Sequence, residues 1–217
     1  MRFDSSARFL VLFSLVLAFS VRGDWTKLSA SEFELSAPPE PETAAYERDF
    51  RELHRWQRSR DEKQCELAAN QLHPTFDALF GTPGAALSEG EYEEVEPLMN
   101  RVFRVSLRIS GYFKNQYQRP RPYSVDKSLR PCIQRPGGSK AYPSSHAAVG
   151  AVGACLLAKK YPGKAVRLRE DGNYVGELRA IAGVHHPSDI EAGQSLGRQI
   201  CEKLLADDEF TQELLGR

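Results

Sequence analysis

The stretch His146-Ala-Ala-Val-Gly-Ala-Val-Gly-Ala-Cys-Leu-Leu-Ala-Lys-Lys160 decides the fold of this chain. It consists almost entirely of alanine, glycine, valine and leucine, and no acidic or basic side chain follows His146 until Lys159. A helix with so little polar surface is stable in water only when other elements cover all of its faces. The stretch therefore predicts a central helix that is buried inside a bundle.

The segments before this stretch have the periodicity of amphipathic helices. Apolar residues recur three and four positions apart from Tyr46 to Trp56, and a second helical segment follows at about 61–72. After Ser88, acidic residues open a longer helix, and its apolar stripe continues to about Tyr117. These helices supply apolar faces that can cover the central one.

The segments after it are also helical. One helix is predicted from about Asn173 to Gly183, and the last from about Ser188 to Ala206. Ser188 is followed three residues later by Glu191, which is the spacing of a capping box at a helix start. Strand-like alternation is rare, and the sequence has no internal repeat. We therefore predict an all-α fold, a single-domain helical bundle.

The first residues of the chain predict export. The uncharged apolar run Phe9–Val21 follows two arginines and precedes a site of small residues, which is the form of a secretory signal peptide. The run is shorter than the roughly 20 residues of a membrane-spanning helix, and an uncleaved anchor is the alternative. We predict a signal peptide at 1–23, an extended proline- and acid-rich leader at 24–42, and one domain at 43–217.

Composition and cysteine content narrow the functional classes. Of the 217 residues, 41% are hydrophobic and 27% charged, and the formal net charge is zero, so no positive field favours nucleic acid as a partner. In an oxidising compartment, one or two disulfides are expected, and the sequence leaves their pairing open. Cys155, among small apolar residues, could equally be a buried thiol. The four cysteines are Cys65, Cys132, Cys155 and Cys201.

A histidine, a carboxylate and an arginine lie close together in the stretch from Arg179 to Asp189. Asp189 is four residues after His185, so it can accept a hydrogen bond from one imidazole nitrogen and leave the other free to attack phosphorus. The guanidinium of Arg179 can bind two phosphate oxygens at once. His186 is the competing nucleophile. The alternative is a His–Asp metal site, for which the sequence offers no third ligand nearby.

Two other segments carry anion-binding groups. Ser144 and Ser145 stand where the central helix begins, and backbone N–H groups at a helix start favour an anion. His146 is then placed to protonate a leaving oxygen. Lys114 and Arg121 add two cations near the end of the preceding helix. Each segment alone fits a plain helix cap or a solvated helix end, whereas the three together predict a phosphate site.

The three segments resemble the signature of the type 2 phosphatidic acid phosphatase (PAP2) superfamily, K-x6-RP, PSGH and SR-x5-H-x3-D. The chain looks most like the class A bacterial non-specific acid phosphatases of that superfamily. The stretch Arg58-Ser-Arg-Asp-Glu-Lys-Gln-Cys65 adds to this likeness, which covers roughly residues 43–206. Two positions depart from the signature: Ser145 stands in place of a glycine, and Leu178 in place of a serine.

The resemblance implies a role for each matching residue. His185 would be the nucleophile that forms a phosphohistidine, Asp189 would orient it, and His146 would act as general acid and then as general base. Arg119 does not match the lysine spacing, so we expect it to be a rim or structural residue. The resemblance also implies a fold without metal or cofactor. The phosphate-binding residues would be Lys114, Arg121, Ser144, Ser145 and Arg179.

We therefore expect a secreted acid phosphatase that hydrolyses small phosphomonoesters, periplasmic if the source is Gram-negative. No stable membrane association and no nucleic-acid partner are expected, and homo-oligomerisation stays open. The alternatives are a lipid phosphate phosphatase, a vanadium-dependent haloperoxidase-like protein and a non-catalytic phosphate-binding protein. A phosphatase of this kind should resist EDTA and have a bell-shaped pH profile on the acid side of neutrality.

Overall fold

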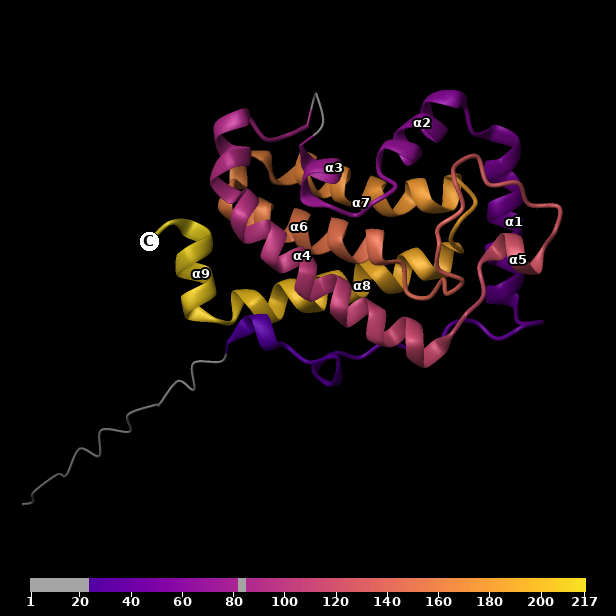
Figure 1. Cartoon of the computed structure of the whole chain (residues 1–217), viewed down its shortest axis with the longest axis horizontal. Helices are drawn as coiled ribbons and strands as arrows, with labels where there is room; N and C mark the ends of the chain where they lie inside the picture. The colour runs from indigo at the N-terminus through magenta and orange to yellow at the C-terminus, as the bar shows by residue number, and fades with distance from the viewer. Residues whose placement is uncertain (1–23, 82–84) are drawn as a thin grey trace, which may run out of the picture.

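α-Helices dominate the computed structural model, which describes residues 24–81 and 85–217 (Figure 1). No β-strand occurs within these ranges, and the all-α prediction is confirmed. The predicted signal peptide at 1–23 lies outside the described residues. The α-helices are α1 (Ala44–Ser59), α2 (Glu62–Asn70), α3 (Phe76–Phe80), α4 (Glu89–Tyr117), α5 (Pro122–Val125), α6 (Ser145–Lys160), α7 (Ala165–Ile181), α8 (Pro187–Leu205) and α9 (Asp208–Leu215).

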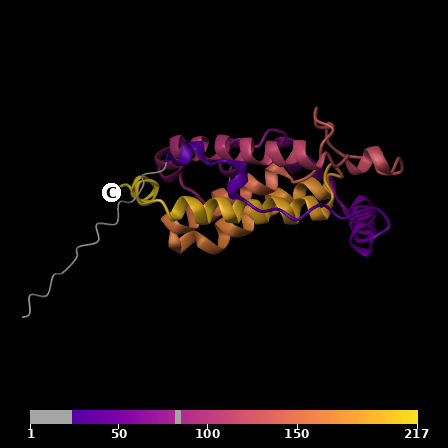
Figure 2. The same ribbon diagram turned by 90° about the horizontal axis from the view of Figure 1, so that it is seen from below.

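The apolar helix α6 lies at the centre of the bundle, as its sequence predicts. Every residue from Ala147 to Ala154 is buried, and α6 packs against α4, α7 and α8. Figure 2 shows α4 on one side of the bundle and α7 and α8 on the other. Small residues allow the close approach of α6 to α7, since a Cβ atom at Gly150 would lie 2.5 Å from the carbonyl oxygen of Gly172.

The long helix α4 begins and ends where the sequence predicts. The Ser88 side chain caps its first turn, and the Glu91 carboxylate accepts from the Ser88 backbone N–H at 2.7 Å. The helix continues to Tyr117, and Gln118 takes a left-handed conformation with φ of 48°. This sharp end directs the following segment, which carries Arg119 and Arg121, back towards the bundle.

Two later helices differ from their predicted starts. α7 begins at Ala165, earlier than the expected position near 173, because its charged first turns hide the apolar periodicity. α8 begins at Pro187, and its N-cap is His186, whose backbone N–H donates to Asp189 at 2.9 Å. The predicted capping box of Ser188 and Glu191 is therefore wrong. Proline favours the first helical position, which places Ser188 inside the first turn.

The segment expected to be an extended leader lies against the bundle. Trp25, Leu28 and Phe33 are buried in the main core, in and beside the 3-10 turns η1 (Trp25–Lys27) and η2 (Ala30–Glu32). Further along, the hydroxyl of Tyr142 donates to the carbonyl of Ser36 at 2.6 Å. This segment therefore adds apolar residues to the core and contacts the chain just before α6.

Two disulfides join distant parts of the chain. Cys65 of α2 pairs with Cys132, and Cys155 of α6 pairs with Cys201 of α8. The pairing left open by the sequence is thus resolved, and Cys155 is not a free thiol. Among the residues described, no helix combines the length and the apolar character needed to cross a membrane.

The helix directions bring the three sequence segments to one end of the bundle. α4 and α7 end there, α6 and α8 begin there, and α1, α2 and α5 lie beside it (Figure 1). The backbone N–H of Ser144 donates to the carbonyl of Asp189 at 2.9 Å, which ties the starts of α6 and α8 together. The positive ends of two helix dipoles thus face this region.

Candidate active site

The turn between α7 and α8 places Arg179 and His185 on one structural unit. Gly183 has a φ of +78°, a left-handed conformation that glycine adopts without strain. The N–H of Gly183 donates to the carbonyl of Ala180 at 2.9 Å, and that of Val184 to the carbonyl of Arg179 at 3.0 Å. This is the hydrogen-bond pattern of a Schellman motif, and it directs the chain straight into His185.

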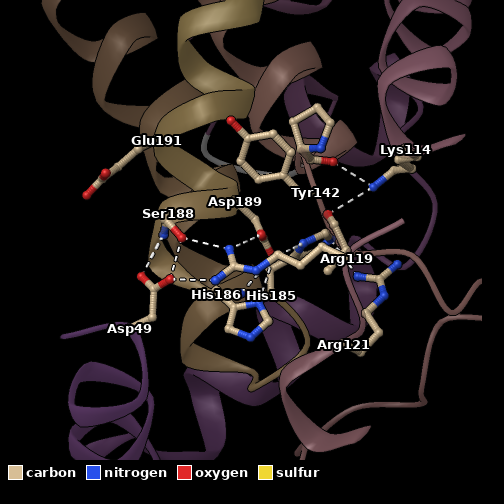
Figure 3. Close-up of polar contacts among 12 residues, drawn as sticks. Asp49, Lys114, Arg119, Arg121, Tyr142, His185, His186, Ser188, Asp189 and Glu191 are labelled. Carbon is tan, nitrogen blue, oxygen red and sulfur yellow. Dashed lines mark hydrogen bonds and ion pairs between the residues drawn. The ribbon is translucent and has the colours of Figure 1, made fainter. Parts of the chain in front are cut away.

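His185 is held at both ring nitrogens and is 3% exposed (Figure 3). Its Nδ1 lies 3.2 Å from Oδ2 of Asp189, and its Nε2 lies 2.6 Å from Nη1 of Arg121. Because a guanidinium can only donate, Nε2 accepts and Nδ1 carries the proton. Burial and the charge of Arg121 hold the pKa of His185 well below its usual range. The imidazole is therefore neutral, with the lone pair of Nε2 facing a cation.

His186 also contacts Asp189 but faces a different environment. Its Nδ1 lies 3.1 Å from Oδ2 of Asp189, and its ring meets the edge of Phe50 at a centroid distance of 5.4 Å. Its Nε2 is buried without a hydrogen-bond partner in the described part of the chain. Of the two adjacent histidines, only His185 presents a ring nitrogen to a site cation.

Asp189 stays ionised although it is fully buried. Burial alone would raise the pKa of Asp189, but hydrogen bonds from His185 and His186 outweigh it and hold the pKa well below its usual range. A buried, charged carboxylate can fix the tautomer of a neighbouring imidazole and stabilise positive charge that develops on it. The geometry around Asp189 fits the orienting role expected from the sequence.

The start of α6 supplies hydroxyls and backbone N–H groups. Ser144 is fully buried and caps the helix by accepting from the N–H of Ala147 at 3.3 Å. The hydroxyl of Ser145 lies 2.8 Å from that of Ser110 on α4. Ser145, which replaces the glycine of the signature, thus has a partner on a neighbouring helix. Sequence reasoning did not single out Ser110, because it lies within the apolar stripe of α4.

His146 contacts the end of α2 as well as the site cations. Its Nε2 lies 2.7 Å from the carbonyl oxygen of Gln71. Burial, followed by the charge of Arg179, lowers the pKa of His146 to about 3. His146 is therefore neutral when the site holds no anion. A bound phosphate dianion would favour its protonated form, because an opposite charge at close range raises the pKa of an imidazole.

Arg179 is 2% exposed and also points at α2. Its Nη2 donates to the carbonyl of Ala68 at 2.7 Å, and its Nη1 to that of Gln71 at 3.3 Å. Its Nε is buried without a hydrogen-bond partner among the residues described. A buried, unsatisfied donor costs free energy, and an anion oxygen would remove that cost. Burial lowers the pKa of Arg179 to about 10, so the side chain remains a cation.

Lys114 and Arg121 bind backbone carbonyls on the other side of the site. Lys114 donates to the carbonyls of Pro143 at 2.6 Å and Ala141 at 3.1 Å (Figure 3). Burial lowers the pKa of Lys114 to about 7, and the charge of Arg121 acts in the same direction. Arg121 donates to the carbonyl of Val184 at 2.9 Å. Both cations are thus fixed to the segments that carry the two histidines.

Arg119 is buried and does not lie at a rim. Its Nη1 donates to Asp189 at 2.6 Å, and its Nη2 donates to Asp49 of α1 at 2.9 Å. Sequence reasoning missed Asp49. Its signal was available, because Asp49 lies among Tyr46, Phe50 and Leu53 on the apolar face of a predicted helix.

The arrangement can bind a tetrahedral oxyanion and attack it. The starts of α6 and α8 adjoin a neutral imidazole whose Nε2 accepts from Arg121, and Lys114 acts on the same ring. Arg179 acts on His146 in the same region. Within residues 24–81 and 85–217, no three or more His, Cys, Asp or Glu side chains group in a way that could hold a metal ion. The predicted residues brought into this region are Lys114, Arg121, Ser144, Ser145, His146, Arg179, His185 and Asp189.

Comparison with protein families agrees with this chemistry. Residues 101–201 match the model of the PAP2 superfamily. That range contains all three segments that form the site.

Several curated proteins are similar to the chain. The acid phosphatase of Zymomonas mobilis is 27% identical over 135 residues, which cover 60% of the chain and 51% of that protein. The non-specific acid phosphatase of Providencia stuartii is 27% identical over 156 residues, covering 70% and 62% respectively. That of Salmonella typhimurium is 26% identical over 186 residues, covering 77% and 70%. The chain thus spans between half and two thirds of the first two relatives.

A solved structure has the same fold. A bacterial vanadium-dependent iodoperoxidase superposes with a TM-score of 0.65 at 16% identity, covering 85% of the chain and 56% of that protein. At this identity the likeness concerns the fold alone. It extends beyond residues 101–201.

Proposed function

We propose that the chain, whose residues 101–201 match the model of the PAP2 superfamily, is a secreted, metal-independent acid phosphatase of that superfamily acting on phosphate monoesters. The observation that carries the proposal is the state of His185. Its Nδ1 is held by Asp189, and its Nε2 offers a lone pair beside Arg121. Binding alone would not need an imidazole prepared as a nucleophile.

In the proposed reaction, the phosphate group replaces the present contacts of Arg121 with His185. Arg121, Arg179 and Lys114 neutralise its oxygens together with the N–H groups at the start of α6. Nε2 of His185 attacks phosphorus, the bond from phosphorus to the ester oxygen breaks, and a phosphohistidine forms. His146 gives its proton to the leaving alkoxide, so that an alcohol departs.

The second step returns the site to its first state. Water attacks the phosphorus, the bond between phosphorus and nitrogen breaks, and inorganic phosphate forms. His146 takes the proton of the water, which regenerates the acid needed for the next cycle. Throughout both steps, Asp189 stabilises the positive charge on the ring of His185 through its Nδ1–H.

Several observations support the choice of substrate class and compartment. The similar curated proteins are acid phosphatases, two of them named as non-specific. The short apolar run near the start of the sequence has the form of a signal peptide, and two disulfides agree with an oxidising compartment. Soluble phosphomonoesters are therefore the proposed substrates.

The test is hydrolysis of p-nitrophenyl phosphate at mildly acidic pH in the presence of EDTA. We expect turnover by the wild type, loss of turnover in His185→Ala, and residual turnover in His186→Ala, which also loses one contact with Asp189. Quenching the wild type in alkali after exposure to labelled substrate should trap label on His185. Unlabelled protein, or activity that EDTA abolishes and zinc or magnesium restores, would contradict the proposal.

A further inference from the structure

The two carboxylate oxygens of Asp189 have separate partners (Figure 3). Oδ2 faces His185 Nδ1 at 3.2 Å and accepts from the backbone N–H of His186 at 2.9 Å. Oδ1 accepts from Nη1 of Arg119 at 2.6 Å. A carboxylate bound at one oxygen only can rotate about its terminal bond. The contact with Arg119 therefore decides which oxygen faces His185, and in what plane.

Arg119 is in turn held by Asp49, a residue of α1. Nη2 of Arg119 donates to Oδ2 of Asp49 at 2.9 Å, while its Nη1 also donates to the hydroxyl of Ser188 at 2.7 Å. Asp49 accepts from the backbone N–H of Ser188 at 2.9 Å and from its hydroxyl. Asp49 thus binds the guanidinium and the first turn of α8 at the same time, one residue before Asp189.

The whole network is closed to water. The side chains of Asp49 and Asp189 are 0% exposed, and that of Arg119 is 6% exposed. Burying ionised groups costs free energy, and apolar residues of similar volume often stabilise a fold as well or better. A purely structural role is therefore a poor explanation for two buried carboxylates that converge on one guanidinium beside the candidate nucleophile.

We propose that Asp49 and Arg119 are positioning residues that act through Asp189 to hold His185 in the orientation and tautomer needed for attack. The inference deepens the proposed function and rests on it. Neither residue touches the reacting atoms. Through Asp49, helix α1 would therefore help to position the nucleophile, although it lies outside the three signature segments.

The network also sets how strongly Asp189 acts on His185. The positive charge of Arg119 partly neutralises the carboxylate of Asp189. Without Arg119, the full negative charge of Asp189 would raise the pKa of His185 and favour its imidazolium form. An imidazolium cannot attack, so the acid limb of the rate profile should move to higher pH. The other charged or titratable groups that act on His185 or share Asp189 with it are Lys114, Arg121 and His186.

The test compares Asp49→Asn with Glu191→Gln in the full chain. Asp49→Asn keeps the size of the side chain but turns one acceptor into a donor that opposes Nη2 of Arg119. Glu191→Gln is the matched control, because Glu191 pairs with Arg48 at 3.4 Å and also joins α8 to α1, but on the exposed surface. Arg119→Lys is a second variant, which keeps the positive charge but lacks the two guanidinium nitrogens that bind Asp49 and Asp189.

We expect kcat on p-nitrophenyl phosphate to fall about tenfold in Asp49→Asn, as for the loss of one charged hydrogen bond, with KM little changed. Asp49→Asn removes a buried negative charge near His185, which disfavours the imidazolium, so the acid limb should move to lower pH. Arg119→Lys keeps the positive charge, so it should keep the wild-type limb while its kcat falls. Glu191→Gln should stay within about twofold of the wild type. Nitrogen NMR should show His185 as one tautomer in the wild type and as a mixture in Asp49→Asn.

Activity is expressed per folded molecule, measured by near-UV circular dichroism, so that unfolding cannot imitate the effect. Wild-type kcat, pH limb and tautomer in folded Asp49→Asn would overturn the proposal. An equal fall in kcat in Glu191→Gln would also overturn the proposal. If the wild type itself does not hydrolyse the substrate, the proposed function fails, whereas the tautomer of His185 still decides whether Asp49 and Arg119 position the ring.

Discussion

The lowered pKa of Lys114 predicts how the proposed phosphatase activity is lost above neutrality. Lys114 contacts two backbone carbonyls and no carboxylate, and burial lowers its pKa to about 7. A lysine is a cation below its pKa and neutral above it, so the charge that we propose binds phosphate is present in acid and lost in alkali. The fall should appear in kcat/KM, which reports the free enzyme.

The perturbation is Lys114→Met, which keeps the length of the side chain and removes the charge. One charge-assisted hydrogen bond contributes about 1.5–3 kcal/mol, so at pH 5 the variant should lose roughly 10- to 150-fold in kcat/KM. At pH 9 only about 1% of a lysine with a pKa near 7 is protonated. The difference between wild type and variant should then shrink to about twofold or less.

The assay is kcat/KM for p-nitrophenyl phosphate between pH 5 and pH 9, written as the ratio of wild type to variant. The ionisation of the substrate cancels in that ratio. Lys140→Met is the control. Lys140 lies on the loop before α6 and donates to Asn115 of α4 at 2.7 Å, so its variant should give a ratio near one at every pH. A large ratio for Lys114→Met that does not change with pH would refute the reasoning, since it would mean that Lys114 stays charged.

Two further predictions concern stability. Gly150→Ala should lower the free energy of unfolding by about 1–3 kcal/mol, because its Cβ would lie 2.5 Å from the carbonyl oxygen of Gly172. Thermal unfolding measures this loss. The control is Gly163→Ala, whose Cβ would meet open space and which should change the free energy of unfolding by less than about 0.5 kcal/mol. Replacing Cys65 and Cys132 by serine should lower the free energy of unfolding by about 4 kcal/mol, because their disulfide joins residues that are 67 positions apart in the sequence. An unchanged denaturant midpoint would contradict this prediction.

Local patterns in the sequence were sufficient for most helices. The apolar stretch from His146 to Lys160 predicted a central helix, and the acidic first turn after Ser88 predicted the start of α4. Both signals depend on neighbouring residues only. The start of α8 could not be predicted in the same way, because its N-cap is His186, which is not among the residues that usually cap helices.

By itself, the sequence determined the helical class and the buried character of α6, which follow from composition and periodicity. It also predicted the residues proposed to bind and attack a phosphate group, from the spacing of short segments and their resemblance to a family signature. Only the tertiary structure decided that Asp49 and Arg119 meet Asp189, that Arg179 and His146 face the end of α2, and which cysteines pair. Those contacts join residues up to 111 positions apart, and helix packing and burial, rather than any local pattern, bring them together.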